Sequence, residues 1–271
     1  MLLSTNDLEG YAIRATDGAI GKVSDFYFDD EAWVIRYLVV DTGTWLSSRS
    51  VLISPISIGI PDWADKVLPV SITKEQVKNS PDIDTDKPVS RQHERRYLGY
   101  YGYPYYWGGS GLWGGAAYPG SMTGYGTFLD MPYTMSPEAQ EAYARADQAQ
   151  HQNDDPRLRS CKAIISYHIE AIDGDIGHVQ GLLVDAETWA IRYMIVDTSN
   201  WWLGHQVLVA PQWIKDVSWS DTTVSVNLTR QAVQDAPPYD PTVQLDRKQE
   251  TDIYKHYGRP GYWKGEAKHK S

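Results

Sequence analysis

The chain contains one segment twice, and this duplication limits the folds that it can adopt. The first copy of the segment runs from Asp17 to Thr42, and the second runs from Asp173 to Thr198. Their sequences, DGAIGKVSDFYFDDEAWVIRYLVVDT and DGDIGHVQGLLVDAETWAIRYMIVDT, align without a gap at a constant shift of 156 positions (173 − 17). An internal repeat of this kind predicts two structural units with the same fold. Any fold assigned to one half must therefore also suit the other.

Each copy has the pattern of a β-meander. Its Asp-Gly pair favours a tight hairpin, because glycine accepts the positive φ that such a turn demands. An alternating apolar run, an acidic turn, a Trp and a β-branched run follow. Gly21 and Gly177 lie inside strand patterns, where glycine marks a bulge or a sharp bend. Short strands between frequent turns indicate a small barrel or sandwich in each copy, and we predict a mainly β protein with two small barrels; in the first copy we predict strands at 11–15, 21–28, 34–40, 51–54 and 67–72.

The repeat continues beyond the predicted strands. Thr73 and Gln76 have capping-box spacing, which predicts a short helix that stops before Pro81. Residues 90–107 then align with 246–263 at the same shift. Each segment predicts an amphipathic helix that starts at Ser90 or Asp246, ends at Gly102 or Gly258, and leads into Tyr106-Trp107 or Tyr262-Trp263. We expect these aromatic arms to dock on their barrels; a loosely held tail is the alternative.

Residues 108–158 have no counterpart in the repeat. They are first rich in glycine and then helical in pattern from about Ser136, which predicts a flexible linker with a short helix. Two small barrels in one chain invite pairing with each other or a homodimer. The predicted domains are barrel 1 at 1–81, arm 1 at 82–107, the linker at 108–158, barrel 2 at 159–237, and arm 2 with a basic tail at 238–271.

Composition and charge narrow the function classes. The formal charge of −10 disfavours a nucleic-acid backbone as the main partner. The single cysteine, Cys161, excludes an intrachain disulfide and fits a reducing compartment; it is either a nucleophile or, as we favour, an inert side chain. The start of the chain has no signal-peptide pattern, and no window approaches the ~18 apolar residues that span a bilayer. We therefore expect a cytoplasmic protein without a transmembrane segment.

Motifs for catalysis are not found in the sequence. The seven histidines are scattered, and nucleophile-elbow, Walker and dinucleotide-binding patterns are missing. We expect no enzyme activity, cofactor or metal. Acidic residues recur at the predicted turns. They form either a divalent-ion or proton-transfer site or, as we favour, hydrogen bonds that cap the turns. Arg36 and Arg192 either pair with an acid such as Asp29 or Asp185, or point to solvent; we favour pairing. The residues with predicted turn or strand roles are Asp17, Gly18, Gly21, Arg36, Asp41, Asp173, Gly174, Gly177, Arg192 and Asp197.

Both copies resemble a known domain, the PRC-barrel. The resemblance covers about 4–81 and 160–237 and rests on Gly21-x-Val23…Asp29…Arg36-Tyr37-x-Val39-Val40 and on its twin, Gly177-x-Val179…Asp185…Arg192-Tyr193-x-Ile195-Val196. The PRC-barrel is the small β domain of the photosynthetic reaction centre H subunit and of a ribosome maturation factor. The resemblance implies protein docking and assembly rather than catalysis. This chain departs from both proteins, because we expect no counterpart of the H subunit's transmembrane helix or of the maturation factor's amino-terminal barrel.

The sequence therefore predicts a non-enzymatic protein-interaction or assembly module with an unidentified protein partner. One alternative is an accessory factor of a membrane electron-transport or reaction-centre-like complex, associated with the membrane peripherally. A lesser one is an RNA- or ribosome-associated factor, which the charge disfavours. Some of the tryptophans are available either to a partner or to packing between the barrels. The predicted interaction surface consists of Trp45, Trp63, Trp107, Trp201, Trp202, Trp219 and Trp263.

Overall fold

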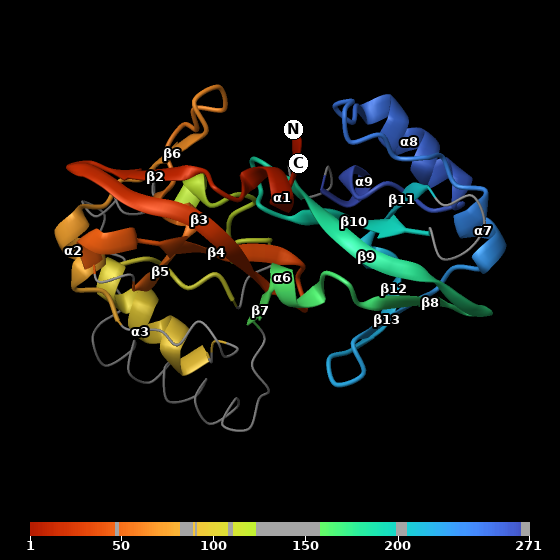
Figure 1. The fold of residues 1–271 in the computed structure, drawn as a ribbon, viewed down its shortest axis with the longest axis horizontal. Coiled ribbons are helices and arrows are strands. Elements are labelled where there is room, and N and C mark those ends of the chain that lie inside the picture. Colours follow the sequence, from red (N-terminus) through yellow and green to blue (C-terminus); the bar gives the residue numbers. More distant parts are fainter. Residues whose placement is uncertain are drawn as a thin grey trace. The chain divides into compact units, whose positions relative to one another are not determined.

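The computed structural model describes residues 1–46, 49–81, 89, 91–107, 111–122, 158–198 and 205–266, apart from the side chains of 91, 92, 265 and 266. These residues form two compact units. The N-terminal unit comprises the described residues of Glu9–Ser160 together with Glu187–Trp189. The C-terminal unit comprises those of Met1–Leu8, Cys161–Ala186 and Ala190–Ser271. The fold is mainly β, as the sequence predicts, and each unit contains one sheet (Figure 1).

The sheet of the N-terminal unit is a meander with one parallel strand added at its edge. Its order is β5-β4-β3-β2-β6, antiparallel except for the β2–β6 pair. Seven consecutive residues of β4 are buried, so this strand forms the centre of the core. The elements are β2 (Ala12–Ala15), β3 (Gly18–Asp29), β4 (Val34–Asp41), η1 (Gly43–Leu46), β5 (Ser50–Ile53), η2 (Pro55–Ser57), β6 (Val67–Pro69) and α2 (Lys74–Lys78).

The sheet of the C-terminal unit contains the same succession of elements. Its order is β11-β10-β9-β8-β13-β12, and most elements stand 156 positions after their counterparts (Figure 1). The continuous strand β12 is an addition, because its counterpart in the N-terminal unit makes two isolated bridges, Ile58 with Val70 and Asp62 with Val67. The elements are β8 (His168–Ala171), β9 (Gly174–Asp185), β10 (Ile191–Asp197), β11 (Gln206–Val209), η3 (Pro211–Trp213), β12 (Ile214–Ser218), β13 (Thr223–Val226) and α7 (Arg230–Gln234).

The sequence predicts closed barrels, but the sheets of the described residues are not closed. Neither strand order returns to its first strand, so both sheets are open in the described part of the chain. β5 and β11 are the edge strands that a closed barrel would pair with a further strand. Here, groups outside the sheet form hydrogen bonds with them. In the N-terminal unit the Tyr97 hydroxyl donates to the Leu52 carbonyl of β5 at 2.9 Å. In the C-terminal unit the Tyr239 amide donates to the Gln206 carbonyl of β11 at 2.7 Å.

Backbone geometry at the predicted glycines is the same in both units. A Cβ on Gly21 or Gly177 would lie 2.0 Å from the carbonyl oxygen of Asp41 or Asp197, so a larger residue is excluded there. The pairing of β2 with β3 and of β8 with β9 shifts register next to these glycines. The predicted bulges are therefore confirmed.

The strand that begins each sequence copy lies in the sheet of the other copy. β1 (Leu2–Ser4) pairs antiparallel with the end of β9, and β7 (Leu158–Ser160) pairs antiparallel with the end of β3. These strands are counterparts at the same shift of 156, so the exchange is reciprocal. The short helices α1 (Thr5–Leu8) and α6 (Cys161–Ile164) follow them and both lie in the C-terminal unit. The free Cys161 is buried.

The two exchanged strands are held by different chemistry. In β7 the Arg159 Nε lies 3.0 Å from Asp30 Oδ2, and the Ser160 hydroxyl donates to Asp25. The counterparts of Asp25 and Asp30 are Gly181 and Ala186, which offer no carboxylate to β1. β1 is held instead by hydrogen bonds of its backbone and by burial of Leu2. Only β7 meets acidic partners, so the two acceptor edges are chemically distinct.

The predicted arm helices are present and docked. They are α3 (Arg91–Tyr101) and α8 (Arg247–His256), and a short α9 (Trp263–Glu266) follows α8. Asp246 and Gln249 form the capping box of α8, while Ser90 lies outside the described residues. Gly102 and Gly258 follow the helices with φ of 69° and 62°, as a C′ glycine does. Because Tyr97, Leu98, Ile253 and Tyr254 are buried, the alternative of loosely held tails is wrong for these residues.

We expect Arg159→Glu to loosen β7 from β3, because a carboxylate would then face Asp30. The free energy of unfolding should fall by about 1–2 kcal/mol. Urea denaturation measures the loss, and hydrogen exchange should show faster exchange of the amides of Leu158–Ser160. Asp30→Arg combined with Arg159→Glu restores an opposite-charge pair. A double variant that is no more stable than Arg159→Glu alone would show that this pair does not hold the strand.

Candidate functional site

A buried arginine joins the sheet of the N-terminal unit to its arm. Arg36 lies in the middle of β4 and is 3% exposed. Its Nη2 lies 3.3 Å from Asp29 Oδ2 and its Nη1 donates to the Leu112 carbonyl at 2.6 Å. The guanidinium carbon stands 3.9 Å from the ring centroid of Tyr106 and 4.9 Å from that of Trp113. The predicted pairing of Arg36 with an acid is confirmed, and the aromatic hook supplies a cation–π partner.

Asp29 holds the turn at the same time as it pairs with Arg36. Its Oδ1 accepts the backbone amides of Glu31 and Ala32 at 3.1 and 3.2 Å, which is the turn chemistry that the sequence favours. The turn ends at Trp33, whose φ of 54° is unusual for a bulky residue. Asp29 therefore connects the β3–β4 turn to the arm through one side chain.

A buried glutamate lies beside the arginine and completes the docking of the arm. Glu94 of α3 is 2% exposed, and its Oε2 accepts the hydroxyls of Tyr37 at 3.4 Å and of Tyr106. Burial raises the pKa of Tyr37 well above its ordinary value, and the Glu94 charge raises it further. The sequence patterns above assign no role to this glutamate. Its identity in both copies, as Glu94 and Glu250 at the shift of 156, is the sequence feature that indicates one.

The same cluster recurs in the C-terminal unit. Arg192 pairs with Asp185 at 3.5 Å, and its guanidinium carbon lies 4.0 Å from the ring centroid of Tyr262. Glu250 Oε1 accepts the hydroxyls of Tyr193 and Tyr262 at 3.0 and 2.9 Å. The predicted pairing of Arg192 is confirmed. Strand, arm helix and aromatic hook are therefore connected by the same side chains in both units, and we call these two groups the arm clusters.

Part of the predicted flexible linker belongs to the first arm cluster. Trp113 is fully buried, and its Nε1 donates to the Thr188 carbonyl at 2.8 Å. Hydrogen bonds between Gly111 and Gly114 and between Trp113 and Ala116 fold the surrounding backbone. The expectation of a flexible tether is wrong for residues 111–122, because burial of the indole against Arg36 orders them. The predicted linker helix from Ser136 lies outside the described residues.

The tryptophans of the predicted interaction surface are half-buried where they are described. Trp45 donates to the Ile20 carbonyl, with Lys74 Nζ 4.5 Å from its ring centroid. Trp63 and Trp219 pack against Tyr11 and Tyr167, with ring centroids 6.2 and 6.0 Å apart. The structure brings Trp107 and Trp263 together with tyrosines of their own arms. Trp201 and Trp202 lie outside the described residues, so this surface stays a prediction.

Several predicted acidic residues act on the backbone. Asp17 and Asp173 accept the first amides of α2 and α7, from Lys74 and Arg230, at 2.8 and 2.7 Å. Asp41 accepts the Gly43 amide at 2.8 Å. Gly18 and Gly174 occupy the turns with φ of 141° and 132°. Asp197 ends β10 as Asp41 ends β4.

Metal-ligand clusters and membrane-spanning helices are both missing from the described residues. No group of three or more His, Cys, Asp or Glu side chains in this part of the chain could hold a metal ion. No helix among the described elements is long and apolar enough to cross a membrane.

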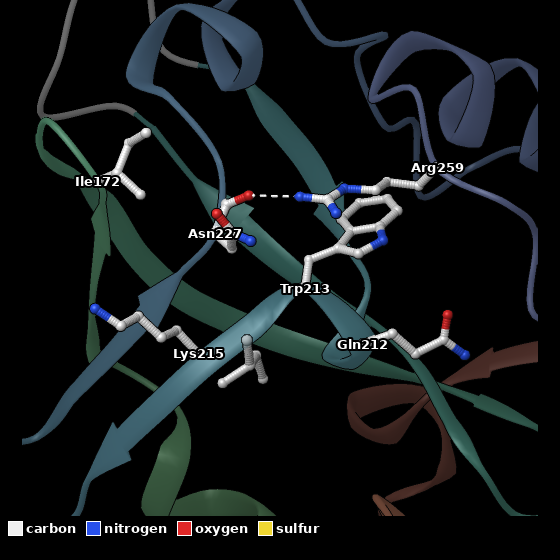
Figure 2. A pocket seen from close by; sticks show the side chains of 7 residues that line it. Ile172, Gln212, Trp213, Lys215, Asn227 and Arg259 are labelled. Carbon is white, nitrogen blue, oxygen red and sulfur yellow. Dashed lines mark hydrogen bonds between the residues drawn. The ribbon is translucent and has the colours of Figure 1, made fainter.

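The C-terminal unit contains a hollow of about 340 Å³ beside its arm (Figure 2). The indole of Trp213 lies close to the guanidinium of Arg259, which donates through Nη2 to the Asn227 carbonyl at 3.0 Å (Figure 2). Ile172 stands at the other side and is 64% exposed. The hollow therefore joins an apolar wall to two cations. Its lining residues are Ile172, Gln212, Trp213, Ile214, Lys215, Asn227 and Arg259.

The repeat differs at the positions that line the hollow. The counterparts of Trp213, Lys215 and Arg259 are Ser57, Gly59 and Tyr103. The Tyr103 ring stacks on Tyr101 with centroids 5.4 Å apart, and burial raises its pKa to about 12. The two units share the arm cluster, but the cationic residues of the hollow belong to the C-terminal unit alone.

Comparison with known proteins identifies one domain. The family model of the PRC-barrel domain matches residues 2–77. An uncharacterised protein of Deinococcus radiodurans is 37% identical over 87 residues, which is 32% of this chain. The match spans about a third of that relative's length, 31%. The resemblance of the first sequence copy to the PRC-barrel is therefore confirmed.

We expect Arg36→Met to destabilise the protein by about 3 kcal/mol, because it leaves Asp29 buried without its ion pair and removes the cation from the aromatic rings. Denaturant titration followed by circular dichroism measures the change. Lys74→Met is the matched control, since it removes a half-buried cation from the Trp45 ring; its cost should stay below about 1 kcal/mol. Equal costs for the two variants would contradict the importance of the first arm cluster.

The buried tyrosines predict loss of stability in alkali. Burial, and then the Glu250 charge, raises the pKa of Tyr262 to about 12, and burial raises that of Tyr103 to about 12. An unfolded tyrosine ionises near pH 10. The folded state therefore binds more protons above pH 10, and stability that is complete below pH 10 should be lost as pH rises through about 12.

Tyrosinate absorbance at 295 nm and far-ultraviolet circular dichroism measure this alkaline transition. The two signals should change together for the buried tyrosines, because these ionise on unfolding. Complete ionisation of all tyrosines at about pH 10.5, with the circular dichroism unchanged, would contradict the burial.

Proposed function

We propose that the protein is a non-enzymatic protein-interaction or assembly module built from two PRC-barrel-type domains. The match of residues 2–77 to the PRC-barrel family supports the assignment of the first domain. The partner is a protein, and the partner-binding surface includes Tyr105 of the first arm and Tyr118 after it.

Shared geometry supports the assignment of a second domain of this type from about 160 to 237. The second copy has the same strand order through its meander and the same close approach at its glycine. Its turn also ends in a tryptophan at positive φ, since Trp189 has a φ of 59° beside 54° at Trp33. Conformations of this kind are uncommon and arise from specific local packing. Their recurrence at one shift supports a common fold for the two copies.

The observation that carries the proposed function is the exposure of tyrosines in and after the first arm. Tyr105 and Tyr118 are 39% and 47% exposed, whereas Tyr97 and Tyr106 of the same region are buried. Tyr105 stacks on Trp107 with centroids 4.7 Å apart and an interplanar angle of 17°, so the pair forms a preordered apolar surface. Exposed aromatic side chains held in place are typical of the residues that dominate binding energy at protein interfaces.

Affinity purification of the intact chain tests this function. We expect a specific partner to be retained by the wild-type chain and lost, by about tenfold or more, with Tyr105→Ser and Tyr118→Ser combined, because the exposed rings supply the contact. Quantitative mass spectrometry of the captured proteins measures the ratio. Tyr100→Ser is a matched control, since the Tyr100 hydroxyl already bonds to the Gln76 carbonyl of the same unit. Equal capture by wild type and the double variant would refute this surface.

A further inference from the structure

The strand β12 forms one edge of the sheet in the C-terminal unit. It is last in the strand order and pairs with β13, from Ile214 opposite Val226 to Ser218 opposite Thr223. An edge strand carries a row of backbone amides and carbonyls that another strand can pair with. At the corresponding place the N-terminal unit has two isolated bridges, Ile58 with Val70 and Asp62 with Val67, so a continuous strand there is specific to the C-terminal unit.

The hollow lies at the start of this edge strand. Both Ile214 and Lys215 line it. Successive side chains of a strand normally point to opposite faces, but β12 has a bulge at Lys215, so the neighbours Ile214 and Lys215 both line the hollow. The register shift between Ile214 and Asp216 marks the same place. A strand added to β12 would therefore pass the hollow.

The hollow offers an apolar wall next to positive charge. Ile172 and Trp213 form the wall, and Ile172 is largely exposed. Lys215 and Arg259 are its charged residues, and none of the seven lining residues is acidic. The Asn227 carbonyl fixes the guanidinium of Arg259 at the rim (Figure 2). Lys215 and Arg259 favour carboxylates near the hollow, and the acidic residue of the same edge strand, Asp216, lies outside its lining.

We propose that the edge of β12 binds an extended acidic segment of a protein partner. The segment pairs with the backbone of Ile214–Ser218 as an added strand. One of its apolar side chains enters the hollow against Ile172 and Trp213, and its carboxylates lie near Lys215 and Arg259. This site rests on the proposed function only in taking the partner to be a protein, and it is separate from the tyrosines of the first arm.

Binding of a synthetic acidic peptide to the intact chain tests the site. The probe is a fluorescein-labelled octapeptide with alternating acidic and apolar residues, DVELDVEL, and its control, KVKLKVKL, has every acidic residue replaced by lysine. Fluorescence anisotropy measures the dissociation constants. We expect the acidic peptide to bind at least about tenfold more tightly than the basic one, and less tightly as salt rises.

Two variants locate the binding at the hollow. Lys215→Glu should weaken the acidic peptide by about tenfold, because it reverses the charge at the edge. Arg259→Tyr introduces the residue of the corresponding position in the other copy and should weaken binding similarly. Lys248→Glu is the matched control: it makes the same change of net charge on the exposed face of α8, outside the hollow, and should change the dissociation constant less than about twofold. Circular dichroism of each variant confirms that it is folded.

Hydrogen exchange distinguishes strand addition from attraction by charge alone. The amides of Ile214–Ser218 should exchange more slowly when the acidic peptide is bound. Equal binding of the acidic and basic peptides, equal weakening by Lys215→Glu and Lys248→Glu, or unchanged exchange in β12 would each overturn the proposal. These results leave the partner capture by Tyr105 and Tyr118 unaffected, so failure of this site and failure of the proposed function are distinguishable.

Discussion

The buried pair of Arg36 and Asp29 connects more of the N-terminal unit than any other contact described above. Asp29 holds the turn between β3 and β4, Arg36 lies in the most buried strand, and the guanidinium is covered by Tyr106 and Trp113. A buried ion pair is stable only when its remaining hydrogen-bonding groups find partners. The Leu112 carbonyl and the aromatic faces help meet that demand, so the arm and the glycine-rich segment after it must fold onto the sheet. The second arm cluster repeats this logic with Arg192 and Tyr262.

Strand exchange gives the duplication a second consequence. The first strand of each copy completes the sheet of the other copy, so neither copy contains its whole sheet within its own sequence. Acidic residues on one acceptor edge and small residues on the other make the two edges unequal. Arg159 and Ser160 would lose their charged partners if β7 replaced β1, and Asp25 and Asp30 would lose theirs. Unequal edges of this kind favour one pairing over its alternative.

The two units have diverged where a shared scaffold does not constrain them. The arginine, aspartate, glutamate and two tyrosines of the arm clusters are identical in both units, because each satisfies a buried group of another; Trp113 has no counterpart in the C-terminal unit. The two units differ at the hollow, where the C-terminal unit has Trp213, Lys215 and Arg259 and the other copy has Ser57, Gly59 and Tyr103. Differences of this kind between duplicated domains are compatible with distinct binding surfaces on one scaffold. In the N-terminal unit we propose the exposed Tyr105 and Tyr118 as the corresponding binding residues.

Local signals in the sequence determined the mainly β fold, the duplication, the helix caps at Thr73 and Asp246 and the glycine bulges, and they favoured the pairing of Arg36 with an acid. These features depend on backbone preferences and on residues near one another in the chain, so short patterns carry them. Only the tertiary structure decided the open sheets, the exchanged strands, the burial of Trp113 and the meeting of Glu94 with Tyr37 and Tyr106. Each of these is a contact between residues distant in sequence, chosen by which buried polar groups and apolar surfaces could satisfy one another. A strand of three residues, such as β7, is too short to carry a sequence pattern that predicts its partner strand. The ion pair between Asp30 and Arg159 forms because the fold brings the two side chains together.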